Sequence, residues 1–347
     1  MLAAVFNGVG DIRVERVADP RIESPTDAVV RISAAGVCGS DLWYYRGSDP
    51  IDPGARLGHE FVGVVEEIGT EVTGLRPGDR VVAPFSYSDG TCPTCRNGLP
   101  TSCSLGGFWG GDASPGGAQA EAIRVPFADA NLVRLPDTGG SATDLVPYLA
   151  LADVLPTALH AVTAGEVGPG SSVTIVGDGP VALATVVCAL RQGAEQVLVL
   201  GHHPQRLALA EKFGATSTAL SPDDAEAVTE LVRRELGDRS STAVDCVGTQ
   251  SSVDSALAAV RDGGVFGYVG LPITGARVTL LDVFDRNVSI RGGVAPARRY
   301  IPELLHDVIE GRIDPSPLFE RLLPLSEVQA AYAAMDQRLA VKAAVLP

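Results

Sequence analysis

The feature that most constrains this chain is a glycine-rich turn between a strand and a helix. Residues 172–176 (SVTIV) form a continuous apolar run, which is typical of a strand buried in a parallel sheet. The turn GDGPVA at 177–182 follows, then a helical segment over 183–191 and a second apolar strand over 197–200. This order predicts a dinucleotide-binding βαβ unit whose glycines let the backbone approach a pyrophosphate at the helix N-terminus. The turn residues expected to contact the cofactor are Gly177, Gly179, Pro180 and Val181.

The end of the second strand bears on which dinucleotide binds. An NAD-binding unit usually has Asp or Glu there, about 20 residues after the glycines, to hold the ribose 2′-OH. This chain has Gly201, His202, His203 and Arg206 instead, with no acidic residue among them. We expect these four residues to contact the cofactor, and their charges predict NADP rather than NAD. In the alternative interpretation, the two histidines belong to a solvated loop.

Length and charge restrict the function classes. At 347 residues the chain is long enough for two domains sharing one cleft. Its net charge of −15, from 42 acidic and 27 basic residues, argues against nucleic acid or an anionic membrane as the main partner. The N-terminus lacks the pattern of a signal peptide, and the six cysteines do not suggest a disulfide framework. We therefore expect a cytoplasmic protein.

The first 130 residues are patterned differently from the rest. Short β-forming runs, at 28–33, 61–69 and 81–84, alternate with Gly, Pro and Asp. Such strands with regular turns predict a small, mostly β, barrel-like domain. The glycines within 61–69 indicate bulges or close backbone approach. The predicted fold class is α/β, with this β domain beside a doubly wound parallel sheet.

Three separated residues, two in this part of the chain and one beyond it, form a candidate metal site. His59 lies in Gly58-His59-Glu60, Cys38 lies in a polar turn, and Asp153 is a lone carboxylate in an apolar run. Thiolate, imidazole and carboxylate are usual ligands of a catalytic zinc, which keeps one tetrahedral position open. A His-Glu pair by itself is more often an ordinary surface or core feature. Our hypothesis is that Cys38, His59 and Asp153 bind zinc.

Further motifs place this candidate site in a wider pattern. After Gly58-His59-Glu60 come Gly63, Gly69 and PGDRV at 77–81. Together with the runs at 243–248 and 264–270, they resemble the zinc-containing alcohol dehydrogenases of the medium-chain dehydrogenase/reductase (MDR) family over nearly the whole chain. The resemblance implies a GroES-like catalytic domain over 1–153 and 295–347 and a Rossmann cofactor domain over 154–294, with the site at their seam. A carboxylate at the ligand position of Asp153 resembles the bacterial branch of the family that has a carboxylate ligand there.

A second metal site is implied by the same resemblance. The family has four cysteines around a structural zinc, separated by two, two and seven residues. This chain has Asp89, Cys92, Cys95 and Cys103 at that spacing, so an aspartate replaces the first cysteine. Aspartate oxygen can bind zinc, and the four residues are expected to do so. Alternatively, the site has lost its metal and persists as packed thiols.

The resemblance also implies roles for other residues. Ser40 matches the hydroxyl that takes the alcohol proton, although it could instead cap a turn. Asp41 matches the carboxylate that orients the ligand His59, and Glu60 either approaches the metal transiently or stays behind its ligands. Lys342 resembles a basic residue facing the cofactor, or it is a solvated charge. Further predicted cofactor contacts are Thr157, Val247, Val269 and Gly270, and the predicted pocket walls, unless they are ordinary core, are Trp43, Phe85 and Trp109.

These residues predict a zinc-dependent alcohol dehydrogenase that interconverts a primary or secondary alcohol with an aldehyde or ketone, preferably with NADP. Aromatic walls favour apolar or aromatic alcohols of medium size. The alternatives are a polyol or amino-alcohol dehydrogenase of sorbitol or threonine type, a binding protein that has lost turnover, and a zinc-free quinone reductase of the same superfamily. The resemblance also implies a homodimer or homotetramer.

Overall fold

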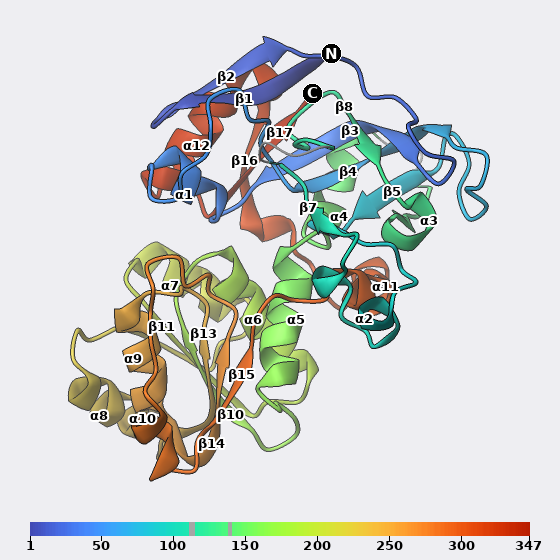
Figure 1. Ribbon diagram of the computed structural model, residues 1–347. Coiled ribbons are helices and arrows are strands. Elements are labelled where there is room, and N and C mark those ends of the chain that lie inside the picture. Colours follow the sequence, from blue (N-terminus) through green and yellow to red (C-terminus); the bar gives the residue numbers. More distant parts are fainter. Residues whose placement is uncertain (111–114, 138–140) are drawn as a thin grey trace. The chain divides into compact units, whose positions relative to one another are not determined.

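A computed structural model describes residues 1–110, 115–137 and 141–347 (Figure 1). The chain forms two compact units, one of Met1–Pro156 with Pro296–Pro347 and the other of Thr157–Ala295. The first unit is built around a seven-stranded sheet with the order β16-β17-β3-β4-β5-β9, in which β8 also pairs with β3. The strands of that sheet are β3 (Ala28–Val37), β4 (Glu60–Ile68), β5 (Arg80–Ala83), β8 (Ala122–Val125), β9 (Val133–Arg134), β16 (Phe319–Pro324) and β17 (Lys342–Leu346).

The remaining elements of the first unit are short, apart from the 13-residue helix α11. Two hairpin-like pairs, β1 with β2 and β6 with β7, stand apart from the main sheet. These strands are β1 (Leu2–Gly8), β2 (Asp11–Arg16), β6 (Ser86–Tyr87) and β7 (Gly107–Phe108). The helices are α1 (Asp41–Tyr45), α2 (Pro93–Arg96), η1 (Pro100–Ser102), α3 (Ala128–Asn131), η2 (Ala142–Leu145), α4 (Val146–Leu149), α11 (Ala297–Ile309), η3 (Ser316–Leu318), η4 (Leu325–Glu327) and α12 (Val328–Asp336).

Gly63 in β4 and Gly69 directly after it lie where two backbones meet closely, as predicted. A Cβ on Gly63 would come within 2.3 Å of the Arg31 carbonyl oxygen, and one on Gly69 would come equally close to the Pro25 carbonyl oxygen. The β3–β4 register shifts at two places near this contact. These irregularities bend the central strands, and Phe61 is fully buried in the core that they enclose.

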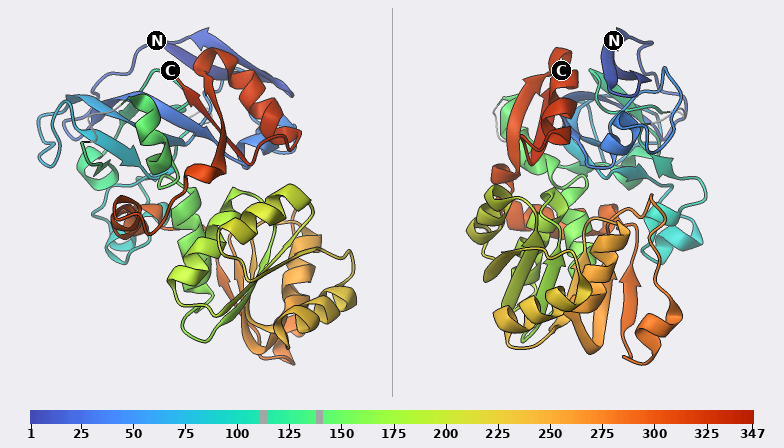
Figure 2. Two further views of the ribbon diagram at one scale, coloured as in Figure 1. Left: turned by 180° about the vertical axis from the view of Figure 1, so that it is seen from behind. Right: turned by 90° about the vertical axis from the view of Figure 1, so that its left-hand side faces the viewer.

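The second unit is a six-stranded parallel sheet with the order β12-β11-β10-β13-β14-β15. Its order reverses beside β10, so the predicted doubly wound sheet is confirmed. Apolar residues of α8, α9 and α10 form one core against the sheet, and α6 and α7 lie on the other face (Figure 2). The elements are α5 (Val154–Ala164), which begins in the first unit, β10 (Ser172–Val176), α6 (Pro180–Arg191), β11 (Gln196–Gly201), α7 (Pro204–Lys212), β12 (Ser217–Leu220), α8 (Ala225–Leu236), β13 (Ser240–Asp245), α9 (Gln250–Ala259), β14 (Val260–Tyr268), α10 (Leu280–Phe284) and β15 (Ser289–Gly292).

One helical stretch, Ala142–Ala164, has the length and apolar composition of a membrane span. Its most apolar window is 78% buried within the protein, as in the core helices of globular folds. The stretch also contains several consecutive short elements, η2, α4 and α5, rather than one straight helix. We therefore assign it to the protein core.

Candidate metal and cofactor sites

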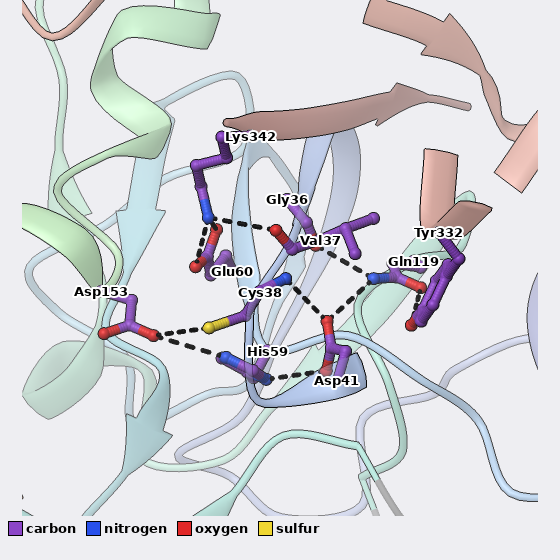
Figure 3. Close-up of polar contacts among 10 residues, drawn as sticks. All are labelled: Gly36, Val37, Cys38, Asp41, His59, Glu60, Gln119, Asp153, Tyr332 and Lys342. Carbon is purple, nitrogen blue, oxygen red and sulfur yellow. Dashed lines mark hydrogen bonds and ion pairs between the residues drawn. The ribbon is translucent and has the colours of Figure 1, made fainter. Parts of the chain in front are cut away.

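The structure brings Cys38, His59 and Asp153 together within the first unit (Figure 3). The Cys38 Sγ atom lies 3.5 Å from Asp153 Oδ2, and His59 Nε2 lies 3.4 Å from the same oxygen. Cys38 directly follows β3, and His59 directly precedes β4. The two residues lie close together because β3 and β4 are antiparallel neighbours. Asp153 directly precedes α5, and the preceding residue, Ala152, accepts a hydrogen bond from the Phe85 N–H at 2.9 Å.

Asp41 holds two of these residues in place. Its Oδ2 accepts the backbone N–H of Cys38 at 2.9 Å, and its Oδ1 lies 3.4 Å from His59 Nδ1. With Nδ1–H directed at Asp41, the lone pair of His59 Nε2 faces Cys38 and Asp153. Burial opposes a charged imidazole, but Asp41, Cys38 and Asp153 outweigh it and raise the pKa of His59 well above its ordinary value. Asp41, Cys38 and Asp153 thus stabilise a positive charge at this place, whether on the His59 ring or on a bound cation.

Two residues that the sequence did not single out support Asp41 from behind. Gln119 Nε2 donates to the Gly36 carbonyl at 3.0 Å and lies 3.4 Å from Asp41 Oδ2. The Tyr332 hydroxyl donates to Gln119 Oε1 at 3.0 Å (Figure 3). Both side chains are fully buried, and they come from segments more than 75 residues away from Asp41, so no local motif marks them.

Glu60 lies beside Cys38, His59 and Asp153 and pairs with Lys342 (Figure 3). The Lys342 Nζ atom lies 2.7 Å from Glu60 Oε2 and 2.8 Å from Oε1, and it donates to the Val37 carbonyl at 3.2 Å. Burial disfavours the ammonium, but Glu60 and then Cys38 raise the pKa of Lys342 above its ordinary value. Lys342 was predicted to contact the cofactor or solvent. Its side chain is instead fully buried on Glu60.

The Cys38 cluster, meaning Cys38, His59 and Asp153 with Glu60 beside them, fits a zinc ion. Each of the four offers one ligand atom, and these atoms all lie within 4.8 Å of one another. A thiol, an imidazole and a carboxylate form a donor set that zinc prefers, and three of them leave a fourth position for another ligand. Ser40, at the start of α1, makes no side-chain capping hydrogen bond there, so its hydroxyl does not have the predicted alternative role of a cap.

A second cluster of Asp89, Cys92, Cys95 and Cys103 has its ligand atoms within 4.8 Å of one another. Asp89 Oδ1 accepts the N–H groups of Thr91 and Cys92 at 2.8 and 3.0 Å, and those hydrogen bonds lower the pKa of Asp89. The Sγ atoms of Cys92 and Cys103 are 3.8 Å apart. The carboxylate therefore faces the three thiols from the position predicted for it. This arrangement, the Cys92 cluster, also fits zinc.

The three aromatic residues predicted as pocket walls have different environments. Trp109 is 3% exposed, donates its indole N–H to the Pro84 carbonyl at 2.6 Å and packs edge-on against Phe61. Trp109 is therefore an ordinary core residue rather than a pocket wall. Phe85 is also buried and stacks on the more exposed Phe108, with ring centroids 5.9 Å apart. Trp43, in α1, is half-buried.

In the second unit, the glycine turn adopts the geometry expected of it. Gly177 has a φ of +120°, and Gly179 is the N-cap of α6, with Pro180 in the first turn. Asp178, between the two glycines, reaches the end of β11, where its Oδ2 accepts the N–H groups of His202 and His203. A carboxylate is thus present beside the second strand, contrary to the premise of the predicted NADP preference. Its position could have been suspected from its place in the turn.

The remaining predicted cofactor residues, apart from Thr157, lie at the carboxyl ends of strands. Val247 follows β13 and packs near Gly177, and Val269 and Gly270 follow β14, both donating to the Asp245 carbonyl oxygen. The Asp245 carboxylate in turn accepts the N–H groups of Val247 and Gly248 at 2.8 and 3.1 Å. In a doubly wound sheet, the carboxyl edge where the strand order reverses is where ligands bind. Thr157 is a half-buried residue of α5.

Comparison with known proteins adds independent findings. Residues 24–137 match the family model described as alcohol dehydrogenase GroES-like domain, and residues 180–310 match that described as zinc-binding dehydrogenase. The chain is 34% identical over 339 residues, 97% of its length and 86% of the relative's, to a probable zinc-binding alcohol dehydrogenase of Mycobacterium tuberculosis. The chain belongs to the zinc-containing alcohol dehydrogenases of the MDR family.

Solved structures agree with this membership. The alcohol dehydrogenase TADH from Thermus sp. ATN1 superposes with a TM-score of 0.91 at 35% identity, covering 100% of this chain and 99% of that one. A zinc-binding dehydrogenase from Sinorhizobium meliloti 1021, solved with NADP, has a TM-score of 0.84 at 26% identity, with coverage of 100% and 99%. The chain is therefore an oxidoreductase with a GroES-like domain and a Rossmann domain, as its sequence predicted.

Proposed function

We propose that the protein oxidises a primary or secondary alcohol to an aldehyde or ketone, reversibly, with a nicotinamide dinucleotide as hydride acceptor. The observation that carries the proposal is the Cys38 cluster, because Cys38, His59 and Asp153 present a zinc donor set with Asp41 orienting the histidine. When bound, zinc lowers the pKa of an alcohol hydroxyl, which favours its ionisation near neutral pH. The hydride chemistry belongs to the nicotinamide.

The chain's own residues supply positioning and proton transfer. Cys38, His59 and Asp153 hold the metal, and Asp41 fixes the tautomer of His59 by accepting from Nδ1. Ser40 takes the alcohol proton, since its hydroxyl makes no capping bond within α1. Glu60 stays behind the ligands, because Lys342 binds both of its carboxylate oxygens.

The Cys92 cluster has a different role in this proposal. Its four ligand positions are all filled by side chains from one short segment, so no position is left for substrate. We therefore propose a structural zinc that ties Asp89 and Cys103 to the turn of α2. The domain limits predicted from the sequence, 1–153 with 295–347 and 154–294, remain part of the proposal, with zinc held by the first and dinucleotide by the second.

The alcohol itself is proposed only by class. Phe85 and Trp43 remain candidate walls after Trp109 is assigned to the core, and they favour apolar or aromatic alcohols of medium size. A polyol or amino-alcohol substrate is the competing proposal, since a carboxylate ligand such as Asp153 also resembles the polyol branch. Rates with matched panels of simple alcohols, polyols and amino alcohols separate the two. A polyol turned over faster than every simple alcohol would favour the alternative.

Self-association and location are also proposed. Three residues of α10, the helix that precedes the edge strand β15, are strongly exposed, with Leu280 at 84%, Leu281 at 72% and Phe284 at 76%. An exposed apolar edge of this kind requires a cover, and a second copy of the chain would supply one. We propose a homodimer or homotetramer in the cytoplasm. Sedimentation equilibrium that shows a monomer at micromolar concentration would contradict the proposed self-association.

The experiment that tests the proposed reaction combines turnover with metal analysis. Ser40→Ala should lower kcat strongly and leave the zinc content unchanged, whereas Asp153→Ala should lower both. Reduced nicotinamide is followed by absorbance with an alcohol panel. Undiminished turnover in Ser40→Ala would remove Ser40 from the mechanism. No turnover with any alcohol, aldehyde or ketone in the zinc-loaded protein would favour a binding protein instead.

A further inference from the structure

Asp178 uses its carboxylate at the end of β11 rather than in its own turn. Its Oδ2 accepts the N–H groups of His202 and His203 at 2.7 and 2.8 Å, and it lies 2.9 Å from His203 Nδ1. The Oδ1 atom lies 3.7 Å from Arg206 Nη1. A single acidic side chain of the glycine turn therefore contacts the side chains of His203 and Arg206, two of the three groups after β11 that could attract an anion, and the exposed His202 contacts it through the backbone N–H.

The backbone is shaped around this carboxylate. A Cβ at Gly201 would lie 2.7 Å from both Cβ and Oδ2 of Asp178, so only glycine fits where β11 ends. Asp178 is 7% exposed. Burial favours the neutral acid, but the hydrogen bonds from His203 and from the two amides outweigh it and hold the pKa of Asp178 below its ordinary value. The side chain is therefore an anion at neutral pH, held in a fixed position.

Two of the side chains that would bind a 2′-phosphate, those of His203 and Arg206, are already engaged by Asp178. Arg206 is only 6% exposed and faces Asp178, and the Nδ1 atom of His203 is directed at the same carboxylate. A 2′-phosphate at the end of β11 would have to displace Asp178 from these groups or lie beside a fixed negative charge. A ribose 2′-OH, by contrast, can donate a hydrogen bond to a carboxylate. In dinucleotide-binding units, an acidic residue at this place holds that hydroxyl.

We infer that Asp178 selects NAD and excludes NADP, doing from the glycine turn what an acidic residue at the end of the second strand does in other NAD-binding units. The inference rests on the proposed dinucleotide-dependent function. It replaces the preference for NADP that the sequence suggested, because that preference assumed that no carboxylate lies near His203 and Arg206.

The test measures binding of NADH and NADPH separately, by calorimetry without any alcohol. The zinc-loaded wild-type protein is compared with Asp178→Asn and Asp178→Ala. Asp238→Asn is the matched control, because it removes the same charge from an exposed residue. Asp238 lies just before β13, at the amino ends of the strands and away from the glycine turn. We expect the wild type and the control to bind NADH at least about tenfold more tightly than NADPH. Both Asp178 variants should lose most of that ratio, chiefly by tighter NADPH binding.

Two results overturn the inference. Either the wild type binds NADPH as tightly as NADH, or both Asp178 variants keep the wild-type ratio. If one variant does not fold, as shown by its thermal unfolding, the other and the wild-type ratio still decide. Failure of the proposed function is a separate result, since it would show as no binding of either dinucleotide to the wild type, which would refute both.

Discussion

The ammonium of Lys342 lies 2.7 Å from the carboxylate of Glu60, and both side chains are 0% exposed. The pair joins the first residue of β17 to the first residue of β4, directly beside His59. Gly36 makes room for it, since a Cβ there would meet Glu60 Oε2 at 2.0 Å. The pair therefore links β17 to the start of β4, next to the predicted zinc ligand His59.

Breaking this pair should destabilise the first unit strongly. Lys342→Met leaves the Glu60 carboxylate buried without its countercharge, and removal of one partner of such a pair costs about 3–5 kcal/mol. Glu60→Gln should have a comparable effect, and the double variant should cost less than the two single changes added together. Calorimetric unfolding of the four proteins measures this. Arg13→Met, in the exposed Arg13–Asp11 pair, should leave the melting temperature unchanged. Strict additivity of the two changes would contradict the account.

Asp41→Asn should weaken zinc binding at the Cys38 cluster by about 10–100-fold. The amide keeps the shape of Asp41 but removes the charge that favours Nδ1–H on His59, so Nε2 is less often free to bind metal. Competition with a chelator of known affinity gives the constant. Asp52→Asn, an exposed aspartate in the loop before β4, is the control and should leave the affinity unchanged. Equal affinities in all three proteins would show that Asp41 does not orient His59.

Two zinc ions per chain are expected, one in each cluster. Asp89→Ala should reduce the content to one and lower the melting temperature, because three thiols from residues 92–103 then hold the metal with an open position. Asp89→Cys should keep two, since a thiolate is an equally suitable ligand. Elemental analysis of the purified proteins decides the matter. A single zinc in the wild type would show that the Cys92 cluster persists as packed thiols.

Stability should depend on pH through Asp178. Its pKa is lower in the folded protein than in the unfolded chain, because His203 and two amides favour the anion, with Arg206 also near. The resulting stabilisation is fully present above the ordinary aspartate pKa of about 4 and is lost as the pH falls through the lower, folded value. Urea unfolding of wild type and Asp178→Asn should therefore show a difference that is constant from about pH 8 to pH 5 and narrows below about pH 4. A difference in unfolding free energy that widens as the pH falls would contradict this prediction.

Much of this architecture follows from local sequence. The apolar run 172–176 and the glycines at 177 and 179 predict β10, its turn and α6. A strand buried in a parallel sheet needs a continuous apolar run, and a phosphate-binding turn needs glycines at fixed positions. The spacing of Asp89, Cys92, Cys95 and Cys103 likewise predicts their meeting, since one short segment holds all four. Gly63 marks a close backbone contact in the strand where it occurs.

The remaining features depend on long-range packing that no local pattern encodes. Gln119 reaches Asp41, and Tyr332 reaches Gln119, only because segments distant in the sequence pack together. Lys342 reads as a solvated or cofactor-facing charge until β17 is paired with β3, which buries it on Glu60. Local sequence predicts such a carboxylate only at the end of β11 itself, whereas Asp178 reaches this place from the turn that follows the parallel neighbour β10.

Zinc held by Cys38, His59 and Asp153 should be required for alcohol oxidation. The most direct measurement is alcohol-dependent formation of reduced nicotinamide by wild type and Asp153→Ala, with zinc per chain determined on the same samples. We predict that Asp153→Ala keeps the zinc of the Cys92 cluster, loses the other, still binds NADH and has no measurable turnover. Full turnover in an Asp153→Ala protein that holds one zinc per chain would contradict the account.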